Sequence, residues 1–213
     1  MFSEELNTKN WNDYLIDGTD VLKNKLGILD NETLTKKETE ITFQRLTDLY
    51  VEPICMNFNE KHLKAIHYYL FDDIYYFAGK YRNVYMEKNN SYFAPVDQIE
   101  LRLEEIFRFM NDEVKNVSSK YHFACFLADC YAQLLNVHPF REGNGRTIRE
   151  FIREFANEKS KDLPFGEIDF SWSNISGEAI NSIINKSVAF RSVIELEFLK
   201  ALESVDKVSN FSK

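Results

Sequence analysis

Glycine and proline are scarce in this chain, with 7 glycines and 4 prolines among 213 residues. Because these residues form most tight turns, their scarcity argues against a fold of many short strands. The 18 Phe, 11 Tyr and overall hydrophobic content of 44% exclude a disordered chain and are enough to bury a core. We therefore predict an all-α fold whose long helices are joined by few special turns.

The length predicts a single domain over residues 1–213, with an N-terminal arm (1–32), a core (about 33–160) and C-terminal helices (about 161–213). One segment between Lys80 and Pro95 departs from helical periodicity and predicts two short strands around Asn89-Asn90. Elsewhere apolar spacing and capping residues predict helices. One helix ends before Pro53, the next starts at Asn59, and two more cover 97–115 and 120–136. A further helix starts near Arg146, and the last two cover 174–187 and 191–204.

The formal net charge of −8 argues against binding to nucleic acid or to an anionic membrane surface. No apolar run is long enough to cross a bilayer, and the first residues lack the pattern of a secretory signal. The three cysteines, Cys55, Cys125 and Cys130, form no paired framework. We therefore expect a cytoplasmic protein, although export into a host would leave no visible mark.

Residues 137–149 link the most apolar predicted helix to the next one and carry the main functional signal. Gly143, Asn144 and Gly145 are residue types that allow positive φ, so successive backbone N–H groups can point into one concavity at a helix N-terminus. Arg146 and Arg149 would be neighbours in the first helical turn, where two cations oppose the helix dipole and each other. A bound polyanion such as a phosphate chain would compensate for that repulsion.

Two further residues of this segment suggest the chemistry. Glu142 would repel phosphate unless a cation lay between them, which indicates Mg²⁺ bound with a nucleotide. His138 is suited to remove a proton from a hydroxyl group at neutral pH. The segment thus predicts a phosphoryl- or nucleotidyl-transfer site, and it contains no glycine-rich phosphate loop of the Gly-x-x-x-x-Gly-Lys type.

The run His138-Pro-Phe-Arg-Glu-Gly-Asn-Gly-Arg-Thr-Ile-Arg149 resembles the signature of Fic-domain proteins, His-x-Phe-x-(Asp/Glu)-Gly-Asn-Gly-Arg-x-x-Arg, at every defined position. Weaker similarity extends the resemblance to about residues 15–160, in the manner of single-domain bacterial members. It implies an all-α Fic fold, a bundle of about seven to nine helices around a central helix–loop–helix with a β-hairpin flap. It also implies transfer of AMP from ATP to a Tyr, Thr or Ser hydroxyl of a target protein, with release of pyrophosphate.

The resemblance also assigns roles to individual residues. His138 would be the catalytic base, Glu142 would hold Mg²⁺, and Phe140 would anchor the loop. The ATP phosphates would be bound by Gly143, Asn144, Gly145, Arg146 and Arg149, with Asn144 and Arg149 also counted as catalytic. The flap, defined here as residues 84–93, would align the target through Val84, Lys88 and Phe93, although Asn89, Ser91 and Tyr92 are atypical.

Regulation and the exact chemistry are left open by the sequence. Many relatives carry an inhibitory Ser/Thr-x-x-x-Glu motif whose glutamate pairs with the residue matching Arg149, and no Ser or Thr here has Glu four residues later. The glutamate could come from a small antitoxin-like partner, from a divergent helix carrying Glu38, Glu40 or Glu195, or be absent. The alternative reactions are transfer of phosphate or phosphocholine and removal of AMP, and the chain could also act as a toxin component that binds a partner. Self-modification and a homo-oligomer are also open.

Overall fold

The computed structural model describes residues 11–88, 91–177 and 191–203. Six α-helices lie within these residues: α1 (Asn31–Val51), α2 (Glu60–Phe71), α3 (Ile99–Glu113), α4 (Lys120–Val137), α5 (Asn144–Ser160) and α7 (Arg191–Glu203). Short 3₁₀ helices are η2 (Trp11–Tyr14), η3 (Val96–Gln98), η4 (Val114–Asn116) and η5 (Trp172–Asn174). The all-α class is confirmed, and the helix count within the described residues is slightly lower than the predicted seven to nine.

The hairpin predicted between Lys80 and Pro95 is present but very short. It pairs β1 (Glu87–Lys88) with β2 (Ser91–Tyr92) in antiparallel register. The turn expected at Asn89-Asn90 lies outside the described residues. Most of the helix predicted at 174–187 also lies outside them; the single turn η5 covers residues 172–174, and Gly177, the last described residue before the gap, is helical.

Three of the helices begin at side-chain caps. Asp30, Asn59 and Ser119 precede α1, α2 and α4, and each accepts a hydrogen bond from the N–H three residues further along. Helix α5 differs, because its N-cap is Gly143 in the left-handed region and no side chain caps it. It begins at Asn144, two residues earlier than the sequence predicted, so Asn144 and Gly145 belong to its first turn.

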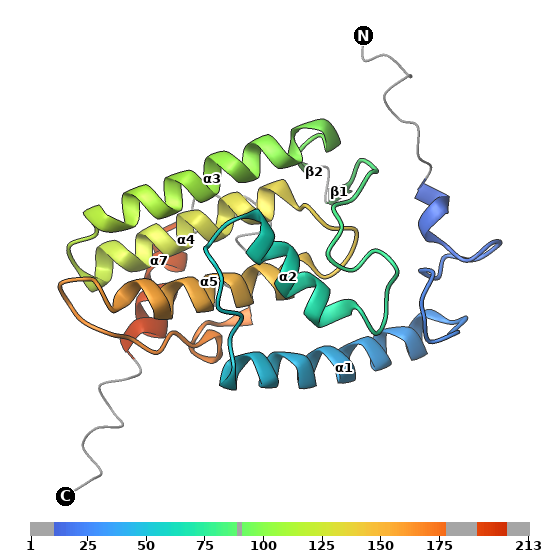
Figure 1. The fold of residues 1–213 in the computed structure, drawn as a ribbon, viewed down its shortest axis with the longest axis horizontal. Coiled ribbons are helices and arrows are strands. Elements are labelled where there is room, and N and C mark those ends of the chain that lie inside the picture. The colour runs from blue at the N-terminus through green and yellow to red at the C-terminus, as the bar shows by residue number, and fades with distance from the viewer. Residues whose placement is uncertain (1–10, 89–90, 178–190, 204–213) are drawn as a thin grey trace, which may run out of the picture.

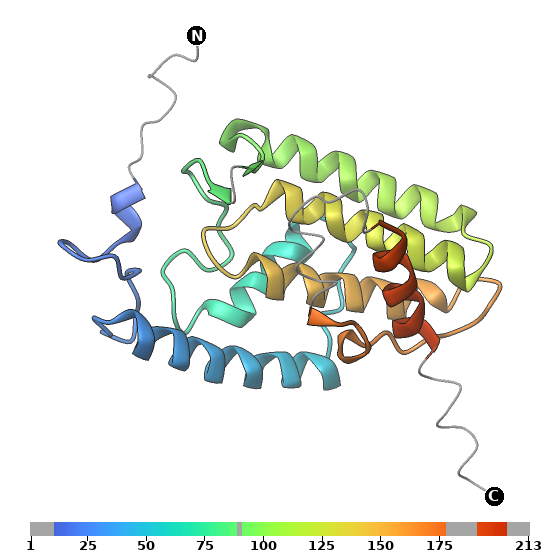
Figure 2. The same ribbon diagram turned by 180° about the vertical axis from the view of Figure 1, so that it is seen from behind.

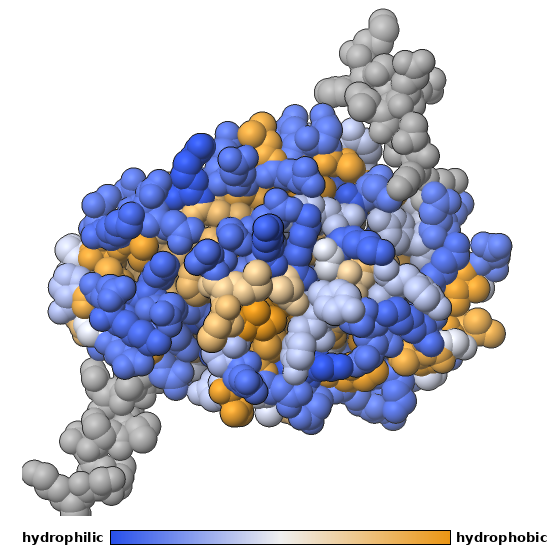
Figure 3. Space-filling view, viewed as in Figure 1, coloured by the Kyte–Doolittle hydropathy of each residue, from blue (hydrophilic) through white to orange (hydrophobic). Residues whose placement is uncertain are grey.

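Helix α4 lies at the centre of the bundle (Figures 1 and 2), packed against α3, α5 and α7. Helix α2 packs on α5, and α1 packs on α2. The predicted stripe of α4 is confirmed, since its members Phe123, Leu127, Cys130 and Leu134 are fully buried. The surface in Figure 3 is mainly hydrophilic, with apolar side chains in small separate groups, and none of the described helices has the length and apolar character needed to cross a membrane.

The loop between α4 and α5, residues 138–143, lies at one end of the bundle and is called the signature loop below. The hairpin lies at the same end, as does the N-terminal arm that contains η2 (Figure 1). The arm reaches the loop through Trp11, whose ring lies 3.8 Å from the Arg141 guanidinium. It reaches the segment just before the hairpin through Tyr14, whose hydroxyl donates to Asn83 Oδ1 at 2.9 Å. This end of the molecule therefore gathers three segments that are remote in sequence.

Candidate active site

His138 ends helix α4 in an unusual backbone conformation. Its φ of 50° lies in the left-handed region, and among the described residues it is the only residue other than glycine with positive φ. The ring of Phe93, at the end of the flap, stacks on the His138 imidazole with centroids 3.8 Å apart and an interplanar angle of 10°. The fold thus places the predicted base in contact with the end of the flap.

Gly143 joins the signature loop to α5 and also lies tightly against α2. Its φ is 78°, and a Cβ added there would lie 2.3 Å from two atoms of the Phe71 ring. No side chain fits in that space, and few side chains tolerate that backbone conformation. Glycine at this position therefore allows the loop to pack directly on helix α2.

The side chain of Asn144 holds the signature loop in shape. Its Oδ1 accepts from the Phe140 N–H at 2.8 Å and its Nδ2 donates to the Phe140 carbonyl at 2.7 Å. The residue is 2% exposed, so the side-chain amide is used within the protein. What Asn144 can offer a ligand is its backbone N–H, in the first turn of α5.

The N-terminus of α5 has an electrostatic environment that favours an anion. The first N–H groups of a helix have no partner within it, and the helix dipole places partial positive charge there. No acidic residue lies in the first turn and no side chain caps it. With Gly143, Asn144 and Gly145 bringing the backbone close, a phosphate group is the natural ligand.

The two signature arginines have different surroundings. Arg146 is held by α1, because its Nη2 pairs with Glu38 and its Nη1 donates to Thr42 Oγ1 at 3.1 Å. Glu38 also accepts a hydrogen bond from the Tyr75 hydroxyl, and Glu142 lies 3.6 Å from the same guanidinium.

No carboxylate of the described residues pairs with Arg149. Its Nη1 lies 3.2 Å from where a Cβ on Gly145 would be, so it crosses closely over the backbone of the first turn. The Trp172 indole donates to the Arg149 carbonyl at 2.8 Å and fixes the helix beneath it. Within the part of the chain that the structure describes, the positive charge of Arg149 beside the α5 N-terminus is therefore not balanced by a carboxylate.

Glu142 has a carboxylate that is accessible and close to this anion site. Its side chain is 43% exposed, and its Oε1 accepts from the N–H of Gly143 at 2.8 Å. Within the described residues no three His, Cys, Asp or Glu side chains gather into a metal cluster. A cation bound at Glu142 would therefore complete its ligand shell with water and ligand oxygens, which is the usual habit of Mg²⁺. The donor chemistry fits Mg²⁺ bound together with phosphates.

His67 on α2 supports the loop and was not recognised from the sequence. It stacks on the buried ring of Phe140 at 3.8 Å, and its Nδ1 accepts from the Gly79 N–H at 2.8 Å. Its Nε2 consequently carries the proton and donates to the Glu142 carbonyl at 3.0 Å. Burial lowers the pKa of His67 to about 4, so the ring is neutral. The sequence showed His67 only as a member of an apolar helix face.

The flap residues named from the sequence occupy three different environments. Val84 is buried at 2% exposure, so its side chain anchors the base of the hairpin in the protein. Lys88 lies in β1, and Phe93 forms the stack on His138. Arg82, just before the flap, is also buried and bonded to the signature loop, and no sequence signal indicated it.

The candidates for a divergent inhibitory glutamate do not contact Arg149. Glu38 pairs with Arg146 instead. Glu40 forms an exposed pair with Lys37 at 2.7 Å, and Glu195 accepts from the Tyr121 hydroxyl at 3.4 Å. Among the described residues, none of the three supplies the expected contact.

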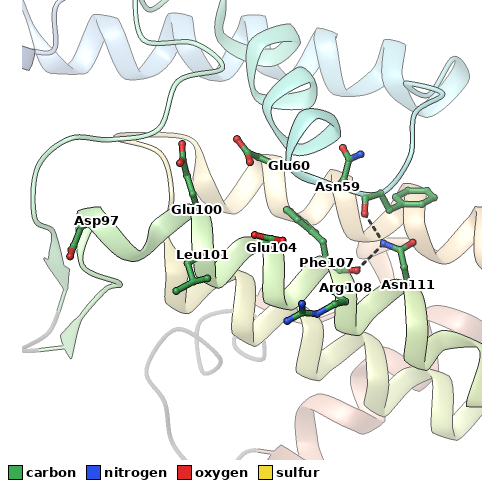
Figure 4. A pocket seen from close by; sticks show the side chains of 10 residues that line it. Asn59, Glu60, Asp97, Glu100, Leu101, Glu104, Phe107, Arg108 and Asn111 are labelled. Atoms are coloured by element: carbon green, nitrogen blue, oxygen red, sulfur yellow. Dashed lines mark hydrogen bonds between the residues drawn. The ribbon is translucent and has the colours of Figure 1, made fainter.

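A pocket of ≈ 240 Å³ opens beside the signature arginines, between α1, α5 and η5, with Arg146, Arg149 and Trp172 among its lining residues. A larger pocket of ≈ 620 Å³ lies between α2 and α3 (Figure 4). The larger one gathers four carboxylates, from Glu60, Asp97, Glu100 and Glu104. That charge would repel phosphate, and none of its lining residues belongs to the signature loop.

Fold and site together define a class of protein: a helical domain in which a central helix–loop–helix presents a histidine stacked on the end of a hairpin, an uncapped helix N-terminus and two arginines. Residues 57–156 match the model of the Fic/DOC family. Over 137 residues the chain is 30% identical to the probable protein adenylyltransferase y4lH of Sinorhizobium fredii, covering 63% of this chain and 70% of that protein. The chain belongs to the Fic/DOC family.

Two further comparisons agree with this assignment. The chain is 37% identical over 152 residues to the protein adenylyltransferase VbhT of Bartonella schoenbuchensis. That match covers 71% of this chain and 32% of VbhT, so the chain spans about a third of that relative. The crystal structure of BepC from Bartonella tribocorum with bound AMPPNP has the same fold, with a TM-score of 0.78, 24% identity, and coverage of 89% of this chain and 96% of that one.

Proposed function

We propose that this chain transfers AMP from ATP to a Tyr, Thr or Ser hydroxyl of a target protein and releases pyrophosphate. The observation that carries the proposal is the convergence around one loop of His138, the uncapped N-terminus of α5, and Arg149, which has no carboxylate partner among the described residues. The similarity to VbhT, a protein adenylyltransferase, and to y4lH, a probable protein adenylyltransferase, supports the reaction type. AMPPNP bound to BepC supports a nucleotide as the donor.

In this proposal the phosphates of ATP lie against the first turn of α5. The backbone N–H groups of Asn144 and Gly145 face the anion, and Arg149 meets the outer phosphates. Arg146 contributes less net charge, because Glu38 already pairs with it. We therefore assign the larger electrostatic share of phosphate binding to Arg149.

Glu142 would hold Mg²⁺ through its exposed carboxylate. When bound, the ion would neutralise charge on the phosphates and orient them. The backbone of Glu142 is held by His67, whose Nε2 donates to the Glu142 carbonyl at 3.0 Å.

His138 would act as the general base. It accepts the proton of the target hydroxyl while the hydroxyl oxygen forms a bond to the α-phosphorus, and the bond from that phosphorus to the bridging oxygen of pyrophosphate breaks. The electron pair of the broken bond leaves with pyrophosphate, and AMP stays on the target. The stacked ring of Phe93 would hold the imidazole in a single orientation for this step.

The flap would bind the target by strand addition. A two-stranded hairpin leaves backbone groups unpaired at its edges, and these groups can pair with an extended segment of another protein. Because Phe93 at the end of the hairpin touches His138, a segment paired there would bring its hydroxyl close to the base.

A separate protein could control the enzyme through Arg149. This residue has no carboxylate partner among the described residues, and the ≈ 240 Å³ pocket opens beside it. A glutamate supplied by a small antitoxin-like partner would compete there with the outer phosphates of ATP. Such a partner is part of the proposal, together with a cytoplasmic site of action.

The test uses ATP labelled at either the α or the γ phosphorus, with Mg²⁺ and protein from a cell lysate as acceptor. Label on protein from the α position alone supports AMP transfer, whereas label from the γ position alone would refute it in favour of phosphorylation. The variant His138→Ala should bind ATP with a fold like that of the wild type and should transfer no label. Persistent transfer by that variant would show that another group is the base.

A further inference from the structure

Arg82, which lies between α2 and the hairpin, is a buried cation held by backbone carbonyls. It is 2% exposed, and no carboxylate of the described residues lies within ion-pair distance of it. Burial lowers its pKa to about 10, so the guanidinium stays charged at neutral pH. A charge in such a place is costly unless all its donors are satisfied. Its partners therefore indicate what the residue is for.

The partners come from two separate parts of the site. Toward the hairpin, Nη1 donates to the Val84 carbonyl at 2.7 Å and Nη2 donates to the Ala94 carbonyl at 2.6 Å. Toward the signature loop, Nε donates to the His138 carbonyl at 2.7 Å and Nη2 also donates to the Val137 carbonyl at 3.2 Å. One planar side chain thus joins both ends of the flap to the end of helix α4.

Backbone hydrogen bonds reinforce the same junction. The N–H of Arg82 donates to the Pro139 carbonyl at 2.8 Å, and the N–H of Ala94 donates to the Asn136 carbonyl at 3.2 Å. Ala94 directly follows Phe93, whose ring lies 3.8 Å above the His138 ring. Arg82 therefore holds the backbone of His138 and the backbone next to Phe93 at the same time, and so sets the spacing of the stacked pair.

We propose that Arg82 is a positioning residue that fixes the target-binding flap relative to the His138 base. The role rests on the proposed function, because it assigns the flap to the target and His138 to proton removal. Arginine suits the task because its rigid fork presents donors in several directions within one plane. Lysine keeps the charge but presents a single ammonium group, which cannot reach carbonyls on both sides.

The experiment compares Arg82→Lys and Arg82→Gln with the wild type and with Arg102→Lys as a matched control. Arg102 is exposed on α3 and donates to Gln98 Oε1 at 2.8 Å, and among the described residues it makes no hydrogen bond or ion pair with the signature loop or the hairpin. Four properties are measured: the rate of transfer from α-labelled ATP to lysate protein at saturating ATP, the half-saturating ATP concentration, the NMR signals of the His138 ring, and the deuterium exchange of the Phe93 and Ala94 amides. Circular dichroism and thermal melting show whether each variant folds.

In folded Arg82 variants we expect the rate at saturating ATP to fall about 100-fold, the effect of a small misplacement of reacting groups. The half-saturating ATP concentration should stay within about twofold, because the phosphate site on α5 does not use Arg82. The His138 ring signals should shift as the Phe93 ring moves off the imidazole. The amides of Phe93 and Ala94 should exchange with deuterium faster than in the wild type, and Arg102→Lys should match the wild type throughout.

Two outcomes would overturn the role. The first is a folded Arg82→Lys protein with the wild-type rate and unchanged His138 signals. The second is failure of both Arg82 variants to fold, which would show that the residue serves stability alone. If the wild type transfers no label, the proposed AMP transfer is refuted. The His138 signals and the amide exchange then still test whether Arg82 holds the flap against His138, because neither depends on the reaction.

Discussion

At the scale of single residues, the amino acids that indicate phosphate binding also build the loop that would bind it. Asn144 braces Phe140 through both atoms of its amide, and Gly143 allows the loop to touch Phe71. The sequence predicted a phosphate ligand at this loop, but it could not show that these side chains face the protein. Substitutions at this scale therefore affect stability and activity together.

Replacing Gly143 with alanine should destabilise the protein more than the same change at Gly166. Both residues have positive φ, 78° and 82°, so both substitutions carry the left-handed penalty of about 1–2 kcal/mol. Only at Gly143 would the new Cβ lie 2.3 Å from the Phe71 ring, which adds overpacking strain of about 1–3 kcal/mol. Urea unfolding should give a loss of about 2–5 kcal/mol for Gly143→Ala, and equal losses at the two positions would contradict the close contact.

His67 should make stability depend on pH between its unfolded and folded pKa values. The unfolded ring has a pKa of 6.5 and the folded ring about 4, so the unfolded state binds more protons in this window. The contribution of neutral His67 is therefore complete above pH 6.5 and is lost as the pH falls toward 4, by about 3 kcal/mol in total.

The measurement is urea unfolding at several pH values for the wild type and for His67→Gln. The stability difference between them should shrink as the pH is lowered through this window. The reason is that only in the wild type does residue 67 take up a proton on unfolding. The exposed residue His122 provides the control substitution His122→Gln. A difference that does not change with pH would show that His67 is not held in its neutral form.

At the scale of elements, the end of α4, the start of α5 and the hairpin act as one unit. Helix α1 joins this unit through Glu38, which reaches Arg146 across a long stretch of sequence. Helical periodicity predicted α2, α3 and α4, which each bury a regular apolar stripe, whereas the buried face of α1 includes the polar side chains of Glu38 and Thr42. Periodicity cannot say which residue of one helix meets which residue of another, so the pairing of Glu38 with the first signature arginine was not foreseen.

The variant Glu38→Gln should lower stability by about 1–3 kcal/mol, because it leaves a mostly buried guanidinium without its main counter-charge. The matched control Glu40→Gln breaks only an exposed pair with Lys37 and should cost less than about 1 kcal/mol. Label transfer from α-labelled ATP should not rise in Glu38→Gln, since Glu38 does not contact Arg149. A clear rise in transfer would instead identify Glu38 as an inhibitory residue.

At the scale of the whole molecule, one hydrophobic core joins residues from Val21 to Leu202. The N-terminal arm and α7 are both attached to it, the arm near the signature loop and α7 on the far side of α4 (Figure 2). We infer that the described residues form a single domain, in line with the prediction from length. The two tryptophans report from opposite parts, Trp11 from the arm and Trp172 from the layer beside α7.

Thermal and urea unfolding of this domain should be a single cooperative transition. Trp11→Phe leaves Trp172 as the fluorescent reporter, and Trp172→Phe leaves Trp11. Their fluorescence midpoints should each coincide with the midpoint of circular dichroism measured on the same variant. An earlier transition reported by Trp11 would show that the arm unfolds separately and that the single-domain inference is wrong.

The sequence by itself determined the helical class, the position of the hairpin and the location of the candidate site in residues 138–149. These features depend on local properties: periodicity, capping side chains, and residue types that permit positive φ. The tertiary structure decided what surrounds the site, namely His67 under Phe140, Glu38 on Arg146, Phe93 over His138 and Arg82 between the flap and α4. These contacts join residues far apart in the chain, and no local pattern encodes which buried side chains will meet when separate helices pack.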